Sequence, residues 1–244
     1  MEKLVYVLWT RDGEPHEALN RRLLGPLRET LSGMGAERLQ INVSDAAVAA
    51  GEGLRQRNIA PAPGAVVSFW LNTAHLRAPY EREIREQAGR IAGYAVSEST
   101  VLPNKEPFAD GTRIDGFAQI ALIARPPRIT QDAFLDVWLK SHTHVGVETQ
   151  SNFYYCQNIV NRYLTYDAPP LAAIVEERFP LGALTDQHLF YDAAGNPGKY
   201  EKNLTRMMES CARFIDFDRI DVMITSAYRF GGWADASGQP DFPR

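Results

Sequence analysis

Two kinds of hydrophobic pattern alternate along this chain: short apolar or every-other-residue runs, and stretches in which apolar residues recur three or four positions apart. The first kind predicts strands and the second predicts helices. In residues 1–102 they predict strands at 4–9, 39–43, 65–71 and 93–102, helices at 15–31 and 79–92, and a short Ala-rich helix at 46–57. The order strand, helix, strand, strand, helix, strand is that of the ferredoxin-like split βαβ unit.

The same order returns in the second half of the chain. Strands are predicted at 116–124, 152–164, 172–179 and 220–230, and helices at 130–142 and 200–214. The first strands of the halves align as LVYVLWTRDG above QIALIARPPR, which places Arg11 opposite Arg125. We therefore expect two units related by duplication, 1–102 and 115–230, with a polar linker at 103–114 and a Gly- and Pro-containing tail at 231–244.

A four-stranded ferredoxin-like sheet covers one face with its two helices and leaves the other face open. That open face has to be buried in a stable protein. Because this chain carries two such units, their antiparallel sheets can pack face to face. The sequence thus predicts an α+β fold in which two tandem βαββαβ units close an intrachain α+β barrel around a central cavity.

Composition limits what the chain binds. A formal net charge of −4 does not supply the basic surface by which proteins bind nucleic acids or anionic membranes. No apolar run approaches the roughly 18 residues of a transmembrane helix, and the first residues lack the apolar segment of a signal peptide. Cys156 and Cys211 both lie in apolar stretches. We expect buried thiols rather than a disulfide, and a cytoplasmic protein.

One predicted helix carries the strongest candidate for chemistry. Phe134, Trp138 and His142 follow each other at intervals of four and therefore share one stripe of the helix. The helix is predicted to loosen at 144–146, which leaves His142 near its C-terminal end. The two aromatic residues suit core packing, whereas His142 suits proton transfer because an imidazole titrates near neutral pH. The structural alternative for His142 is stabilisation by the helix dipole.

The stripe lies within a longer pattern, RPPRITQDAFLDVWLKSHTHVGV, followed by YYCQNIV at 154–160 and AIVEERFP at 173–180. This pattern resembles the EthD-like domain of the dimeric α+β barrel superfamily, whose motif is Phe-x3-Trp-x3-His. That family usually has Ala-Pro-Leu after its histidine, where this chain has Thr-His-Val at 143–145. In the first half, LLGPLRETL takes the place of the motif and puts Leu24 at the histidine position. The resemblance therefore implies one functional pocket per chain.

The resemblance also implies a class of activity. Members of the superfamily act on small, often aromatic or polyketide-like molecules as cyclases, isomerases, decarboxylases or cofactor-free oxygenases. We expect no cofactor, since no Gly-rich phosphate loop or nucleophile elbow is present. We also expect no metal, because His142 and His144 have no third ligand at a diagnostic spacing. His144 remains a weaker candidate for substrate binding.

The strand predicted at 152–164 has polar residues on both faces, which is unusual for a strand that covers a core. One face carries Tyr155 and Gln157, large side chains that could form hydrogen bonds to a ligand. The alternative is a solvent-exposed polar face of an antiparallel sheet. We select Tyr155 and Gln157 as candidate substrate-binding residues.

Charged residues at or near strand ends complete the candidate set. Arg125 ends a predicted strand and could bind a carboxylate or an enolate, although an exposed strand end needs no such role. Glu176 and Glu177 face opposite ways on the strand at 172–179, so one of them could reach the cavity as a base. We select Glu176.

The hypothesis from sequence is an EthD-like enzyme that binds a small apolar or aromatic molecule, with His142 moving a proton. The alternative is a non-catalytic ligand-binding or stress-responsive barrel, which needs the same cavity but no titrating group. Nucleic acids and membranes are not expected as partners, and homodimerisation is left open.

Overall fold

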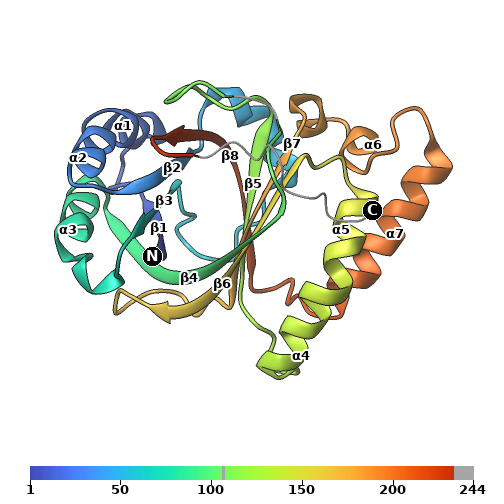
Figure 1. The fold of residues 1–244 in the computed structure, drawn as a ribbon. Coiled ribbons are helices and arrows are strands. Elements are labelled where there is room, and N and C mark those ends of the chain that lie inside the picture. The colour runs from blue at the N-terminus through green and yellow to red at the C-terminus, as the bar shows by residue number, and fades with distance from the viewer. Residues whose placement is uncertain (106–107, 234–244) are drawn as a thin grey trace.

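The strands of the protein form a closed barrel (Figure 1). The computed structural model describes residues 1–105 and 108–233. Its strands are β1 (Glu2–Trp9), β2 (Glu37–Val43), β3 (Ala65–Leu71), β4 (Arg90–Leu102), β5 (Phe117–Ile123), β6 (Tyr154–Tyr163), β7 (Ala173–Phe179) and β8 (Ile220–Phe230). Around the barrel they follow the order β1-β3-β2-β8-β5-β7-β6-β4, β4 pairs with β1, and all neighbouring pairs are antiparallel.

This order contains two ferredoxin-like sheets. The first half contributes β4-β1-β3-β2 and the second half contributes β8-β5-β7-β6, so each half has its own first and third strands in the centre. The sheets join where β2 pairs with β8, with Leu39 opposite Phe230, and where β4 pairs with β6, with Tyr94 opposite Tyr163. The predicted fold, two tandem units closing an intrachain α+β barrel, is confirmed.

The helices lie outside the barrel, one group on each side in Figure 1. Those of the first half are α1 (His16–Arg22), η1 (Leu23–Leu27), α2 (Arg28–Gly33) and α3 (Ala78–Gln87). Those of the second half are α4 (Gln131–Leu135), η4 (Asp136–His142), α5 (Thr143–Thr149), α6 (Gln187–Phe190) and α7 (Pro197–Ala212), and the short helices η2 (Ala46–Leu54), η3 (Ala74–Leu76) and η5 (Leu181–Leu184) lie in the connections. In the described part of the chain, no helix combines the length and apolar character that spanning a membrane requires.

The helix that carries Phe134 and Trp138 is longer than predicted. It begins after Thr130, whose side chain accepts a hydrogen bond from the Ala133 amide at 3.2 Å. Through η4 it widens into a π-helical turn, and the Thr143 hydroxyl donates to the Trp138 carbonyl at 2.9 Å. The backbone N–H of Thr143 donates to the same carbonyl, and the helix continues through α5 instead of loosening at 144–146. The predicted loosening is wrong, and His142 lies inside the helix.

Two other boundaries differ from the prediction for local reasons. The helix expected at 79–92 ends at Gln87, and β4 begins at Arg90. Gly89 lies so close to β1 that a Cβ atom there would be 2.5 Å from the Thr10 carbonyl oxygen, so the chain turns at this glycine. The helix expected at 200–214 begins earlier, because the Asn196 side chain accepts a hydrogen bond from the Lys199 amide at 3.0 Å and caps it.

The predicted linker and the predicted tail are described only in part. Residues 106–107 of the predicted linker at 103–114, and the predicted tail at 231–244 from residue 234 onward, lie outside the described residues. Within the linker, Arg113 forms a β-bridge with Tyr228, and its guanidinium donates to the Ser226 hydroxyl at 2.8 Å. This end of the linker therefore packs against β8.

The side chains that point into the barrel are buried and contact one another across it. On one side they form an apolar cluster that includes Val5, Trp9, Ile120 and Met223. On the other side they are polar, and the Gln40 amide of β2 donates to the Glu176 carboxylate of β7 at 2.6 Å although these strands are not neighbours. The lumen is thus a packed core at these positions, which corrects the expectation of a central cavity.

Replacing Gly116 by Ala is expected to destabilise the fold by about 1–3 kcal/mol. Gly116 precedes β5 with a φ of +84°, and a Cβ atom there would lie 2.2 Å from the Phe179 carbonyl oxygen. Gly25→Ala in η1 is the matched control, since nothing lies within 4 Å of its added Cβ. Urea unfolding of both variants measures the difference, and equal midpoints would contradict the prediction.

Candidate functional site

A cavity of about 330 Å³ lies between the outer face of the second sheet and the helices that cover it. The sheet contributes Gln119, Tyr155, Val175, Glu177 and Val222, η4 contributes Trp138 and His142, and α7 contributes Leu204, Met207, Met208 and Cys211. This volume falls within the range of small-molecule sites. Most of the lining comes from the half that carries the aromatic and histidine stripe, and Gly53, Leu54 and Gln56 of the first half complete it.

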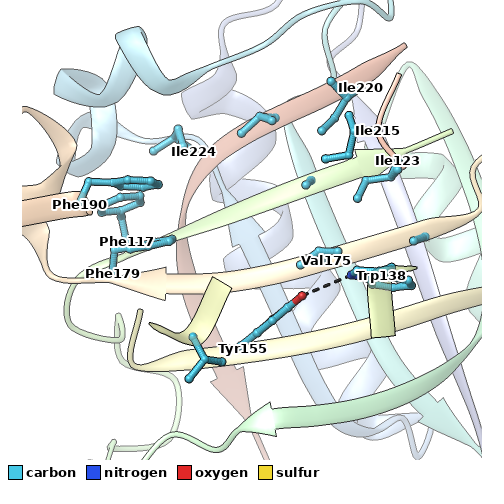
Figure 2. Packing of buried hydrophobic residues seen from close by; sticks show 14 of the residues in the cluster. Phe117, Ile123, Trp138, Tyr155, Val175, Phe179, Phe190, Ile215, Ile220 and Ile224 are labelled. Atoms are coloured by element: carbon cyan, nitrogen blue, oxygen red, sulfur yellow. Dashed lines mark hydrogen bonds between the residues drawn. The ribbon is translucent and has the colours of Figure 1, made fainter. Parts of the chain in front are cut away.

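The wall of the cavity is largely apolar. Figure 2 shows Val175, Trp138, Ile123, Ile215 and Ile220 gathered on one face of the sheet, the face that the helices cover. At the edge, two lining residues with exposed apolar side chains are Met208, at 46%, and Phe217, at 42%. A ligand here would meet apolar surface both at the rim and on the wall.

Glu177 is the acidic residue of this cavity. It lies on β7, half-buried, and accepts a hydrogen bond from the Asn152 side-chain amide at 2.8 Å. Burial raises the pKa of its carboxyl to about 7, and hydrogen bonds from Asn152 and Gln119 limit the rise. A carboxyl with this pKa exchanges protons near neutral pH.

His142 lines the same cavity from the helix above. Its Nδ1 lies 3.0 Å from the Ser210 hydroxyl oxygen, and its ring packs on Phe214 with a centroid distance of 4.6 Å. Burial, and secondarily the positive charge of Arg213, lower the pKa of His142 to about 4. The imidazole is therefore neutral at pH 7.

Tyr155 and Gln157 lie on the outer, helix-covered face of β6. The Tyr155 hydroxyl accepts hydrogen bonds from the Trp138 indole at 3.3 Å (Figure 2) and from the Gln157 amide at 3.1 Å. Gln157 also donates to the Thr143 hydroxyl at 2.8 Å. Tyr155 lines the cavity. Gln157 does not line it and links β6 to the helix through its hydrogen bond to Thr143. Burial raises the pKa of Tyr155, which keeps the phenol protonated.

Three further candidates lie elsewhere. Glu176 points into the barrel, where it pairs with Arg178 at 2.8 Å, because neighbouring residues of β7 face opposite ways. The Arg125 guanidinium donates to the backbone carbonyls of Ile129 and Pro126 and so holds the turn before the helix. His144 is exposed and does not line the cavity. The structure thus brings together His142 and Tyr155 of the selected residues.

Several residues that line the cavity were not among the candidates predicted from the sequence, among them Glu177, Met207 and Cys211. Glu177 was considered together with Glu176, and sequence alternation identified the pair but not which member faces the helices. Met207 and Cys211 are four positions apart on one face of α7, a spacing that signals a shared helix face but not a cavity. Burial raises the pKa of the Cys211 thiol to about 12, so this sulfur stays protonated and contributes to the wall as an apolar group.

Among residues 1–105 and 108–233, no group of three or more His, Cys, Asp or Glu side chains is arranged to hold a metal ion. The polar groups that line the cavity are instead a carboxyl, a neutral imidazole, amide side chains and tyrosine hydroxyls. Such a set can move a proton and form hydrogen bonds to a ligand.

Comparison with known proteins supports the architecture. No protein-family model matches the sequence, and no curated protein matches it significantly. Among solved structures, an anthrone oxidase-like protein is similar with a TM-score of 0.54 and 10% identity, over 97% of this chain and 96% of that one. A chlorite dismutase-like protein, TA0507, is similar with a TM-score of 0.50 and 10% identity, over 93% of this chain and 95% of that one. The chain has the α+β barrel fold of these proteins. At this identity, the similarity of the α+β barrels concerns the fold alone.

Proposed function

We propose that this α+β barrel protein is an EthD-like enzyme that removes a proton from a small, largely apolar aromatic molecule bound between the second sheet and its helices. The observation that carries the proposal is Glu177, a carboxyl with a pKa of about 7 in a mainly apolar cavity. A general base works best when its pKa lies near the working pH. The apolar wall favours an aromatic or polyketide-like ligand.

In this proposal Glu177 is the base and His142 is a hydrogen-bonding partner. The Glu177 carboxylate takes a proton from a carbon beside a carbonyl or from a phenolic hydroxyl, and the electron pair remains on the substrate as an enolate or phenolate. With a pKa of about 4, His142 is neutral and can stabilise the developing oxyanion through an N–H group. In this proposal Glu177, and not His142 as the sequence predicted, transfers the proton.

Hydrogen–deuterium exchange tests this function without assuming the final product. Anthrone, suggested by the name of one structural neighbour, and 2-tetralone are enolisable aromatic ketones. Each would be incubated with the protein in D2O, and loss of the acidic C–H signal followed by NMR. Exchange faster than in buffer supports the enzyme. Saturable binding without faster exchange would instead favour the non-catalytic binding barrel, and absence of both would refute a site for such ketones.

Filling the cavity should weaken ligand binding. Leu204 lines the cavity from α7 and is half-buried, so Leu204→Trp is expected to weaken ketone binding at least tenfold, about 1.4 kcal/mol. Lys202→Trp is the matched control, because Lys202 is exposed on the same helix and does not line the cavity. Fluorescence titration measures both dissociation constants. Equal affinities would place the ligand elsewhere.

A further inference from the structure

A buried hydroxyl connects His142 to the outer surface of the helices. Ser210 of α7 is 3% exposed, and its Oγ lies 3.0 Å from His142 Nδ1. On its other side, Arg213 Nη2 donates to the same oxygen at 3.0 Å and to the Ser141 hydroxyl at 2.8 Å. The three side chains form a chain of hydrogen bonds that runs from the surface to the cavity.

The chemistry of the three groups fixes the direction of the bond from Arg213 and favours one direction for the bond to His142. A guanidinium only donates, so Ser210 Oγ is the acceptor toward Arg213. The buried hydroxyl still has its own proton to donate. Among the described residues, His142 Nδ1 is the acceptor within hydrogen-bonding distance of it. This donation requires a His142 Nδ1 that carries no proton. In a neutral imidazole the proton is then on Nε2.

We infer that Ser210 and Arg213 are positioning residues that hold His142 as the neutral Nε2–H tautomer, so that the imidazole acts as a hydrogen-bond donor to the ligand. His142 lines the cavity, and within the described part of the chain its Nε2 has no protein partner. This inference rests on the proposed function and narrows the substrate class. The ligand carries a carbonyl or phenolic oxygen at the position that the N–H group reaches, and the negative charge gathers on that oxygen as Glu177 removes the proton.

The charges around the imidazole agree with a neutral ring. The charged and titratable groups that line the cavity with it are Glu177 of β7, Tyr155 of β6, and Tyr191, Tyr200 and Cys211. Arg206, Glu209 and Arg213 lie around Ser210 at the outer end of the hydrogen-bonded chain, and Arg206 is paired with Glu148 at 2.6 Å. The Tyr155 phenol and the Cys211 thiol remain uncharged at neutral pH, and Arg213 disfavours an imidazolium. A neutral donor tautomer is thus available throughout the range in which Glu177 titrates.

NMR of the imidazole nitrogens in ¹⁵N-histidine-labelled protein tests the tautomer directly, without any substrate. In the wild type we expect a single Nε2–H form of His142 between pH 5.5 and 8. Ser210→Ala should give a mixture of both tautomers and Ser210→Thr, which keeps the hydroxyl, should restore the single form. Ser141→Ala is the control, since Ser141 contacts Arg213 and not the imidazole. A wild-type Nδ1–H form, or an unchanged tautomer in Ser210→Ala, would overturn the inference.

The exchange assay separates this inference from the function on which it rests. Ser210→Ala is expected to slow ketone exchange up to about tenfold, the effect of one weakened hydrogen bond, with a smaller change in ketone affinity. If the wild type exchanges ketones but holds His142 as Nδ1–H, the positioning role of Ser210 and Arg213 is wrong, whereas the assignment of Glu177 as the base is unaffected. If the tautomer is as inferred but no ketone exchanges, the proposed reaction fails instead.

Discussion

Replacing Glu177 by Gln is expected to slow ketone proton exchange by about 10²–10⁴-fold, the usual contribution of a general base. The amide keeps the shape of the side chain and can still accept the hydrogen bond from Asn152, but it cannot take a proton. Ketone affinity should therefore change little. Glu201→Gln, at an exposed position of α7, is the matched control.

The pH profile of the wild type identifies which group titrates. With Glu177 as the base, the exchange rate should rise with pH and level off above about 7, the raised pKa of that carboxyl. With His142 as the base, the rise would be complete near pH 5, since its pKa is lowered to about 4. A profile that levels off near pH 5, or a Glu177→Gln variant with normal rates, would assign the proton transfer to another group.

Stability distinguishes loss of chemistry from loss of structure. A carboxyl whose pKa is raised by folding costs stability as pH rises from its unfolded value of 4.5 to about 7. Glu177→Gln should therefore unfold at a higher temperature than the wild type at pH 8 and at a similar one at pH 4. His142 acts in the opposite sense, because its lowered pKa removes stability as pH falls from 6.5 toward 4. An inactive Glu177→Gln that is also less stable at pH 8 would point to misfolding.

The fold could be predicted because local periodicity and chain order are enough to define a βαββαβ unit. Strands 65–71 and 220–230 were predicted with the boundaries that β3 and β8 have. The duplication then required the open faces of the two sheets to meet. Helix ends were less predictable, since they depend on single contacts such as the Asn196 side chain that accepts from the Lys199 amide and caps α7.

The site was harder to predict because both faces of the second sheet are buried. In an ordinary half-exposed strand, alternation separates a polar outer face from an apolar inner one. In β7, Glu176 is bound to arginine inside the barrel and Glu177 faces the helices, so both positions carry a carboxylate for different reasons. Only the pairing of β2 with β8 and of β4 with β6 decides which face is inside. Those contacts join distant segments and leave no local signal.

Removing the Glu176 carboxylate is expected to destabilise the barrel by about 3–5 kcal/mol, because it leaves buried arginine charge uncompensated. Glu176 accepts two hydrogen bonds from Arg178, from Nε at 2.9 Å and from Nη2 at 2.8 Å, and Arg178 is 1% exposed. Gln40 links both to Arg229, whose Nε donates to Gln40 Oε1 at 2.9 Å. Glu176→Ala should lower the free energy of unfolding in urea accordingly at pH 7.

The double variant Glu176→Leu/Arg178→Met shows whether the loss comes from the unpaired charge. It removes the charges of the Glu176–Arg178 pair together, leaves Arg229 without this carboxylate, and is expected to be closer to the wild type than Glu176→Ala is. Burial alone would raise the pKa of Glu176, but Arg178 and Arg229 outweigh it and hold the pKa below its usual value. The stability that this carboxylate contributes is therefore present above pH 4.5 and is lost as pH falls below it, so the deficit of Glu176→Ala should shrink in acid. A double variant as unstable as Glu176→Ala, or a deficit that does not change with pH, would mean that packing rather than charge pairing at Glu176 holds the two sheets together.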